Sequence, residues 1–164
     1  MTITLRLFEN SDQAFIKEML YEALYLRPGQ EPFPKSIVEE PALRKYWEAF
    51  GERPGDLGLI AEVDEILAGA IWIRQFTAQK PGYGFVREDI PELSMAIHPD
   101  YQGQGLGNQL LKKMLELAQQ VGCPGLSLSV DKENWANTWY RKYGFQAYKE
   151  VGTAYTLLQL WDGK

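Results

Sequence analysis

A glycine-rich segment in the second half of the chain has the composition of an anion-binding turn. The segment consists of Gln102, Gly103, Gln104, Gly105, Leu106 and Gly107. Alternate glycines remove side chains from the turn, so successive backbone N–H groups can converge on one anion at the start of the following helix, whose dipole adds to the attraction. The turn predicts a phosphate or pyrophosphate site. A plain strand-to-helix corner without a ligand is the alternative that the turn alone leaves open.

Two well-known phosphate-binding motifs do not fit this turn. A Walker-type loop closes with Gly-Lys-Ser/Thr, whereas Gly107 is followed by Asn108 and Gln109, so the required ammonium and magnesium-binding hydroxyl are missing. A dinucleotide-binding fingerprint needs a third glycine or alanine where this chain has Asn108. The spacing therefore excludes both classes.

The spacing Gln102-x-x-Gly105-x-Gly107 resembles the Arg/Gln-x-x-Gly-x-Gly/Ala signature of the GCN5-related N-acetyltransferase (GNAT) family. A second segment, from Asn134 to Phe145, is similar to the later motif of that family, which reads Asn-x-Ala, then Tyr, then Gly-Phe. The resemblance implies that the turn holds the pyrophosphate of acetyl-coenzyme A (acetyl-CoA), and that no metal is required.

The same resemblance implies a mixed sheet that is splayed into a V between its fourth and fifth strands, where the cofactor enters. In this chain those strands would be residues 92–98 and 126–130. The pantetheine arm of the cofactor is rich in amides, so it can hydrogen-bond the free backbone of a splayed strand as an added strand would. We therefore expect main-chain contacts from Met95, Ala96 and Ile97.

Transfer to an amine requires a base. An amine with a lysine-like pKa of about 10.4 is almost wholly protonated near neutrality and cannot attack a thioester until a proton leaves. Glu92 begins the strand expected to line the cleft, and a glutamate near this position is the general base in some family members. A solvated carboxylate without a catalytic role is the alternative for Glu92. His98, the only histidine, is the competing candidate because it titrates near neutral pH.

Tyr140 is the candidate proton donor to the departing thiolate. It matches the family tyrosine, and a phenol stays protonated at neutral pH. The alternative is that Tyr140 only packs with Trp139 and Tyr143 against the sheet. Asn134 matches the family asparagine that contacts the cofactor; a helix cap is its other interpretation, and the two roles can coexist.

Hydrophobic periodicity predicts the elements that must position these residues. Strands are expected at residues 2–7, 57–63, 66–76, 92–98, 126–130, 145–150 and 154–161. Helices are expected after a cap at Asn10 or Ser11, in a stretch ending near Phe50, from 107 to 121, and before Phe145. This order specifies an α/β protein. The resemblance adds a GNAT-like, V-splayed mixed sheet of about seven strands flanked by about four helices, in a single domain over residues 1–164.

Composition limits the function classes. The chain has 164 residues, of which 45% are hydrophobic, and 17 Lys plus Arg against 22 Asp plus Glu give a net charge of −5. This charge argues against nonspecific nucleic-acid binding and weakly favours a cationic acceptor. Cys123 is the only cysteine, so no intrachain disulfide can form. The sequence shows no secretory signal and no membrane-spanning run, and we expect a cytoplasmic location.

These observations predict an N-acetyltransferase that moves the acetyl group of acetyl-CoA to a primary amine of a small molecule or peptide, by direct attack in a ternary complex. No nucleic-acid or membrane partner is expected, and a homodimer is left open. A noncatalytic acyl-CoA-binding regulatory module is the alternative. Packing is the commoner role of aromatic residues on strands and loops, and it is the alternative for the residues that could form the acceptor pocket, which are Tyr25, Arg27, Phe33, Trp72, Arg74, Tyr83 and Phe85.

Overall fold

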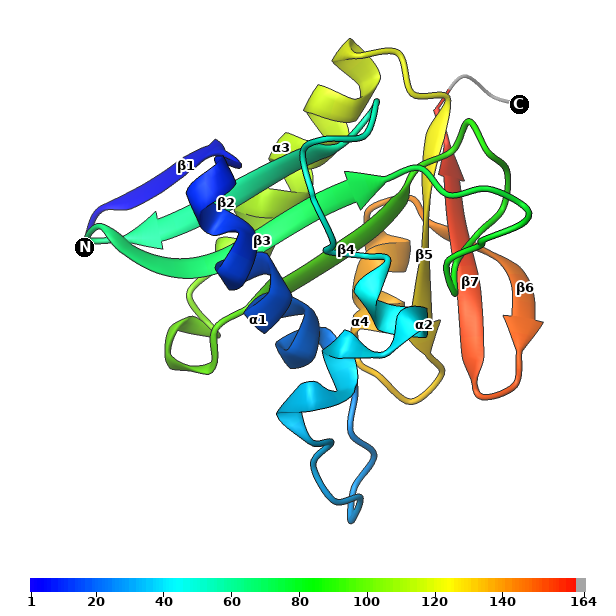
Figure 1. Ribbon diagram of the computed structural model, residues 1–164, viewed down its shortest axis with the longest axis horizontal. Helices are drawn as coiled ribbons and strands as arrows, with labels where there is room; N and C mark the ends of the chain where they lie inside the picture. The colour runs from blue at the N-terminus through cyan, green and yellow to red at the C-terminus, as the bar shows by residue number, and fades with distance from the viewer. Residues whose placement is uncertain (162–164) are drawn as a thin grey trace.

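The computed structural model describes residues 1–161, which contain one seven-stranded sheet in the order β1-β2-β3-β4-β5-β7-β6 (Figure 1). The strands are β1 (Ile3–Leu7), β2 (Leu57–Val63), β3 (Ile66–Arg74), β4 (Glu92–Ile97), β5 (Gly125–Asp131), β6 (Gln146–Val151) and β7 (Ala154–Leu160). The described α-helices are α1 (Gln13–Ala23), α2 (Pro41–Arg44), α3 (Leu106–Gln120) and α4 (Ala136–Lys142). The predicted mixed α/β architecture is confirmed.

Helices cover both faces of the sheet because its central strands are apolar on both sides. Leu59 and Ile71 face the core that contains α3 and Tyr140. The adjacent residues Ile60 and Trp72 face a second core, formed with α1 and the segment around α2. In Figure 1, α1 crosses in front of the strands while α3 runs behind them. This alternation follows the two-residue period of a strand.

The sheet opens between β4 and β5. These two strands are parallel and pair at Glu92 and Ser127, the one register pair recorded between them among the described residues. On its other edge β4 stays paired with β3 along its whole length, from Glu92 opposite Arg74 to Ile97 opposite Gly69. The strands diverge beyond Glu92 (Figure 1). The predicted V-shaped splay is therefore confirmed at the predicted strands.

Two local predictions need correction. The stretch ending near Phe50 is not one helix, because it contains a 3-10 helix (Lys35–Glu39), then the four residues of α2, and then successive turns. Pro41 starts α2 but cannot continue the preceding 3-10 helix, since proline has no N–H to donate. Asn10 does not cap α1; it begins a 3-10 helix (Asn10–Asp12), and the Asp12 carboxylate accepts the Glu9 N–H at 2.8 Å.

A buried arginine fixes the segment that follows α2. The Arg74 guanidinium is 1% exposed and pairs with Asp56, with Nη2 2.8 Å from Oδ2 and Nε 3.0 Å from Oδ1. It also donates to the carbonyl oxygens of Lys45 (3.0 Å), Glu48 (2.8 Å) and Ala49 (3.3 Å). Arg74, one of the residues that could have formed the acceptor pocket, therefore holds the framework together instead.

Trp72 has a similar structural role. It is 1% exposed, and its indole N–H donates to the backbone oxygen of Tyr46 at 3.0 Å. Of the two interpretations of Trp72, acceptor pocket and packing, the structure agrees with packing, since the alternation of β3 directs Trp72 into the core. Among residues 1–161, none of the helices combines the length and apolar character needed to cross a bilayer.

Candidate active site

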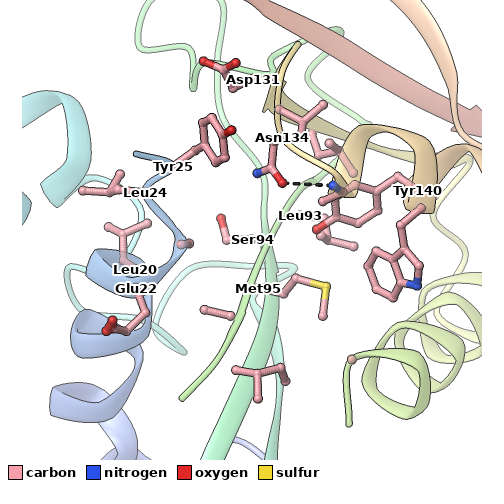
Figure 2. Close-up of a pocket in the computed structure, with 18 of the residues that line it drawn as sticks. Leu20, Glu22, Leu24, Tyr25, Leu93, Ser94, Met95, Asp131, Asn134 and Tyr140 are labelled. Atoms are coloured by element: carbon pink, nitrogen blue, oxygen red, sulfur yellow. Dashed lines mark hydrogen bonds between the residues drawn. The ribbon is translucent and has the colours of Figure 1, made fainter. Parts of the chain in front are cut away.

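A cavity of about 950 Å³ occupies the space where β4 and β5 separate. Its walls come from α1, the segment after α2, β4, the glycine-rich turn, β5 and the start of α4. Figure 2 shows Leu24 and Tyr25 at the α1 side, Asn134 and Tyr140 at the α4 side, and Met95 of β4 between them. The lining includes most of the predicted site residues, namely Glu92, Met95, Ala96, Ile97, Gln102, Gly103, Gly105, Leu106, Gly107, Asn134 and Tyr140. Gln104 is not part of it.

The glycine-rich turn has the backbone shape that an anion site requires. Gly103 and Gly105 have φ values of +80° and +83°, in the left-handed region that favours glycine. A Cβ added to either residue would meet no heavy atom within 4 Å, so the turn faces open space. Gly105 is the N-cap of the 15-residue α3, whose first N–H groups have no intrahelical acceptor. This arrangement fits a pyrophosphate.

Two side chains of the turn contact the protein and do not point toward a ligand. The Gln102 amide donates to the Ile97 carbonyl at 3.2 Å, which fastens the turn to the end of β4. Leu106 is 1% exposed and packs with Val63 and Ala68. Any contact of these residues with an anion would therefore come mainly from the backbone.

Asn108, in the first turn of α3, connects α3 to α4 and its C-terminal end. Its Oδ1 accepts from the Trp139 indole N–H at 2.9 Å and from the Tyr143 hydroxyl at 2.7 Å. The Trp139 ring also lies beside Gly107, where an added Cβ would be 3.7 Å from it. Sequence reasoning used Asn108 only to exclude other motifs and missed this role, for which no local pattern gave a signal.

The free edge of β4 fits an amide-rich chain. Ser94, Met95, Ala96 and Ile97 all line the cavity, and beyond Glu92 no register pair with β5 is recorded for the described residues. Backbone groups on this edge are therefore available to a ligand that lies along the strand. The glycine-rich turn and the strand edge line the same cavity.

Glu92 lies at the root of this cavity and is 4% exposed. Burial raises the pKa of its carboxyl from 4.5 to about 7, although the Tyr46 hydroxyl, the Gly84 backbone and the Lys45 ammonium each lower it. Its Oε1 has no hydrogen-bond partner among the described residues. A carboxylate that titrates near neutrality is suited to accept a proton.

A hydrogen-bonded network connects Glu92 to two other parts of the chain. The Tyr46 hydroxyl donates to Glu92 Oε2 at 2.5 Å and accepts the Tyr83 backbone N–H at 2.7 Å. Tyr46 is 4% exposed and also lines the cavity. Sequence reasoning did not identify Tyr46, because it lies 46 residues before Glu92 in an irregular segment.

Tyr140 lies in the wall of the cavity that α4 contributes (Figure 2). Its ring packs against Trp139 and Phe145, with centroids 5.0 and 5.7 Å away. Burial raises the pKa of its phenol well above the usual value of 10.0, so the hydroxyl keeps its proton at neutral pH. No hydrogen bond from a described residue reaches this hydroxyl. The packing interpretation and the proton-donor interpretation are therefore compatible.

The structure gives the remaining candidates distinct roles. Asn134 Oδ1 accepts the Ala136 N–H at 2.9 Å, which is a capping contact at the start of α4 (Figure 2). His98 Nδ1 accepts the Asp100 N–H at 3.1 Å, and His98 is not among the lining residues. His98 thus caps a turn outside the cavity, which leaves Glu92 as the better placed of the two candidate bases.

The acceptor candidates separate into two groups. Tyr25 and Tyr83 line the cavity, whereas Arg27, Phe33 and Phe85 do not. The Arg27 guanidinium forms ion pairs with the carboxylates of Asp131 (3.1 Å) and Glu133. These pairs fasten the segment after α1 to the end of β5.

The fold and the site together define an α/β protein with a cofactor cleft in a splayed sheet. The chain matches the acetyltransferase (GNAT) family over residues 18–145 and belongs to that family. It is 30% identical to the thialysine N-epsilon-acetyltransferase of Bos taurus in an alignment of 124 residues that covers 70% of this chain and 68% of the bovine protein. Members of the family are acetyl-CoA-dependent acetyltransferases.

Solved structures support the same fold. The PaiA N-acetyltransferase of Thermoplasma acidophilum in complex with coenzyme A has a TM-score of 0.71 and 20% identity, over 98% of this chain and all (100%) of that chain. A GNAT acetyltransferase from Brucella melitensis in complex with acetyl-CoA has a TM-score of 0.64 and 22% identity, over 98% and 88% of the two chains.

Among the described residues no cluster of three or more His, Cys, Asp or Glu could hold a metal ion.

Proposed function

We propose that this protein is an N-acetyltransferase that transfers the acetyl group of acetyl-CoA to a primary amine of a small molecule or peptide, by direct attack in a ternary complex. The observation that carries the proposal is the placement of a buried carboxylate, Glu92, and a buried phenol, Tyr140, in the walls of one cavity. The open glycine turn forms one end of the same cavity.

The cofactor end of the cavity supports acetyl-CoA binding. The backbone N–H groups of the turn around Gly105 and the start of α3 would hold the pyrophosphate. The edge of β4 at Met95, Ala96 and Ile97 would hydrogen-bond the pantetheine arm. Asn134, at the start of α4 beside this edge, would add a side-chain contact. Acetyl-CoA supplies an activated acyl thioester.

Glu92 would act as the general base. A pKa of about 7 leaves roughly half of the carboxylates ionised at neutral pH. Burial makes the ionised form a stronger proton acceptor than an exposed glutamate with a pKa of 4.5. The proton of the ammonium passes to this carboxylate, directly or through one water, and the free amine then attacks the thioester carbon.

Tyr140 would act as the general acid. A thiol such as that of coenzyme A has a pKa of about 8.5. Its sulfur therefore departs more readily when it receives a proton as the C–S bond breaks. Burial raises the pKa of the Tyr140 phenol, so the phenol is protonated before this step.

The lining of the cavity supports a cationic acceptor. It includes the carboxylates of Glu22 and Glu92, the Asp131 carboxylate that is paired with Arg27, and the rings of Tyr25 and Tyr83. Lys, Arg and His are absent from the lining contributed by residues 1–161. A site with this charge attracts an ammonium group, and its aromatic faces can contact the ammonium or the carbon chain that carries it.

Mass spectrometry of the reaction products tests this proposal. The protein is incubated with acetyl-CoA and a panel of amines that contains diamines, arylalkylamines, amino acids and peptides. We expect a product 42 Da heavier than an amine of this panel, formed much more slowly by Glu92→Gln and Tyr140→Phe than by wild type. Tyr148→Phe, on the exposed strand β6, is the matched control. Absence of any acetylated amine despite acetyl-CoA binding would contradict the proposal.

A further inference from the structure

We infer that Tyr46 is a positioning residue for the base: its hydroxyl fixes the Glu92 carboxylate at the root of the splay and ties the loop of residues 77–90 over it. The inference deepens the proposed function and rests on the assignment of Glu92. It assigns a role to a residue outside both sequence motifs of the family.

The hydrogen bonds of Tyr46 define its orientation. A phenol has one proton to donate, and its oxygen can also accept. The Tyr83 N–H occupies an acceptor position at 2.7 Å, and the Tyr46 proton is directed to Glu92 Oε2 at 2.5 Å. Both Tyr46 and Glu92 are 4% exposed. The carboxylate therefore cannot rotate freely without losing a charge-assisted hydrogen bond in a buried site.

Close packing leaves little room for any other arrangement. A Cβ at Gly82 would collide with Glu92 Oε1 and would come within 2.7 Å of the Tyr46 hydroxyl oxygen. A Cβ at Gly84 would lie 2.5 Å from the backbone carbon of Leu128 in β5. The two glycines let the loop pass between the base and β5, so that the loop closes the root of the cavity.

Tyr46 is itself held by the framework. Its backbone oxygen accepts the Trp72 indole N–H at 3.0 Å, and its ring lies 5.0 Å from the Phe76 ring between centroids. The neighbouring Lys45 carbonyl accepts from Arg74 at 3.0 Å. Contacts from Trp72 and Arg74 of the buried strand β3 therefore fix the backbone around Tyr46, and the Tyr46 side chain contacts Glu92.

The charged groups around Glu92 determine what loss of the hydroxyl would do. Lys45 lowers the pKa of Glu92, and its ammonium donates a hydrogen bond to the Pro81 carbonyl. Arg74 is the cross-strand neighbour of Glu92, but its guanidinium is engaged with Asp56. The Tyr46 hydroxyl favours the ionised form of Glu92. Its removal should raise the pKa of the base above 7, because burial would then be opposed by fewer favourable contacts.

A double-mutant cycle with Tyr46→Phe and Glu92→Gln tests the inference. We expect Tyr46→Phe to move the lower-pH midpoint of kcat/KM upward by about one pH unit and to lower kcat/KM at pH 7 roughly tenfold. The KM for acetyl-CoA should stay unchanged. In the Glu92→Gln background the same substitution should change kcat/KM less than about twofold, because a residue that acts through the base has no effect once the base is gone.

Controls separate this role from a purely structural one. Tyr148→Phe removes an exposed tyrosine hydroxyl and should leave the midpoint unchanged. Gly82→Ala keeps the Tyr46 hydroxyl but places a methyl group against Tyr46 and Glu92. It should lower kcat/KM because it displaces the Glu92 carboxylate. Coenzyme A binding by calorimetry and thermal unfolding show whether each variant is folded.

The outcomes distinguish the two levels of the account. Equal losses from Tyr46→Phe in the wild-type and Glu92→Gln backgrounds, or an unchanged midpoint, would overturn the positioning role. Should Glu92→Gln alone keep wild-type turnover, the assignment of the base would fail, and the role of Tyr46 with it. A shifted midpoint together with non-additive losses supports both.

Discussion

Glu92 and Ser127 form the pair at which β4 and β5 meet, and the cleft opens directly beyond it. Both residues are buried, and among the described residues neither Glu92 Oε1 nor Ser127 Oγ has a hydrogen-bond partner. A buried polar atom without a partner costs about 1–3 kcal/mol, and such atoms are uncommon in folded proteins. The sheet therefore places an incompletely satisfied carboxylate where β4 and β5 separate, in the wall of the cavity.

The raised pKa of Glu92 predicts a pH-dependent cost in stability. Between pH 4.5 and about 7 the folded carboxyl holds a proton that the unfolded one has lost, so wild-type stability falls as the pH rises through this window. Glu92→Gln has no such group. We expect the variant to gain roughly 2–3 kcal/mol relative to wild type between pH 4.5 and 8, measured by urea unfolding. A difference that does not vary with pH would contradict the buried, titrating carboxyl.

Tyr140→Phe should slow acetyl transfer without loss of the fold. The phenyl ring keeps its contacts with Trp139 and Phe145, while the proton donor is gone. We expect kcat to fall roughly 10²-fold, with an unchanged KM for acetyl-CoA and an unchanged unfolding midpoint. Steady-state kinetics with thiol detection measures this. An equal fall in kcat for Tyr148→Phe would show that the effect is not specific.

Gly105→Glu should abolish acetyl-CoA binding, because its carboxylate would occupy the anion position at the start of α3. The left-handed backbone adds a strain of about 1–2 kcal/mol for any L residue. Gly152→Glu is the matched control, since Gly152 also has a positive φ (+58°) and open space but lies in the turn between β6 and β7. Calorimetry should show binding only for the Gly152 variant; binding by both would place the anion elsewhere.

Arg74→Met should destabilise the protein by about 3–5 kcal/mol, since it leaves the buried Asp56 carboxylate without its partner. It also removes the donors to three carbonyls of the segment that holds Tyr46. We therefore expect reduced kcat even at temperatures where the variant is folded. Chemical unfolding and kinetics at 15 °C measure the two effects. A loss of less than about 1 kcal/mol would show that the pair is dispensable.

The sequence predicted the parts of the fold that depend on local pattern. The turn at Asp64 and Glu65 lies between the strands predicted at residues 57–63 and 66–76, which could be recognised as apolar runs. Both turn residues adopt the positive φ of a two-residue turn. The turn at Gly103 and Gly105 was predicted because glycine spacing itself encodes left-handed backbone. The V-shaped splay came from the family resemblance, since no local pattern encodes a gap between parallel strands.

The parts that could not be predicted depend on contacts between distant residues. Tyr46 and Glu92 lie 46 residues apart, and Tyr46 belongs to a segment of short turns without periodicity. The structural role of Arg74 was not predicted, because strand alternation gives the face of a residue but not its partner, which is Asp56. Asn108 was missed for the same reason, since its contacts come from α4.

The pH dependence of kcat/KM for acetylation of the best amine in the panel, measured for wild type and Glu92→Gln, tests the central claim most directly. For wild type we predict a rise to a plateau with a midpoint near 7, the pKa of the buried carboxyl. Glu92→Gln should lack this midpoint and fall roughly 10²-fold below wild type at pH 7. The difference in kcat/KM between wild type and Glu92→Gln should narrow as the pH approaches the pKa of the acceptor amine, because a deprotonated amine needs no base. A variant with the wild-type midpoint and rate would show that Glu92 is not the base.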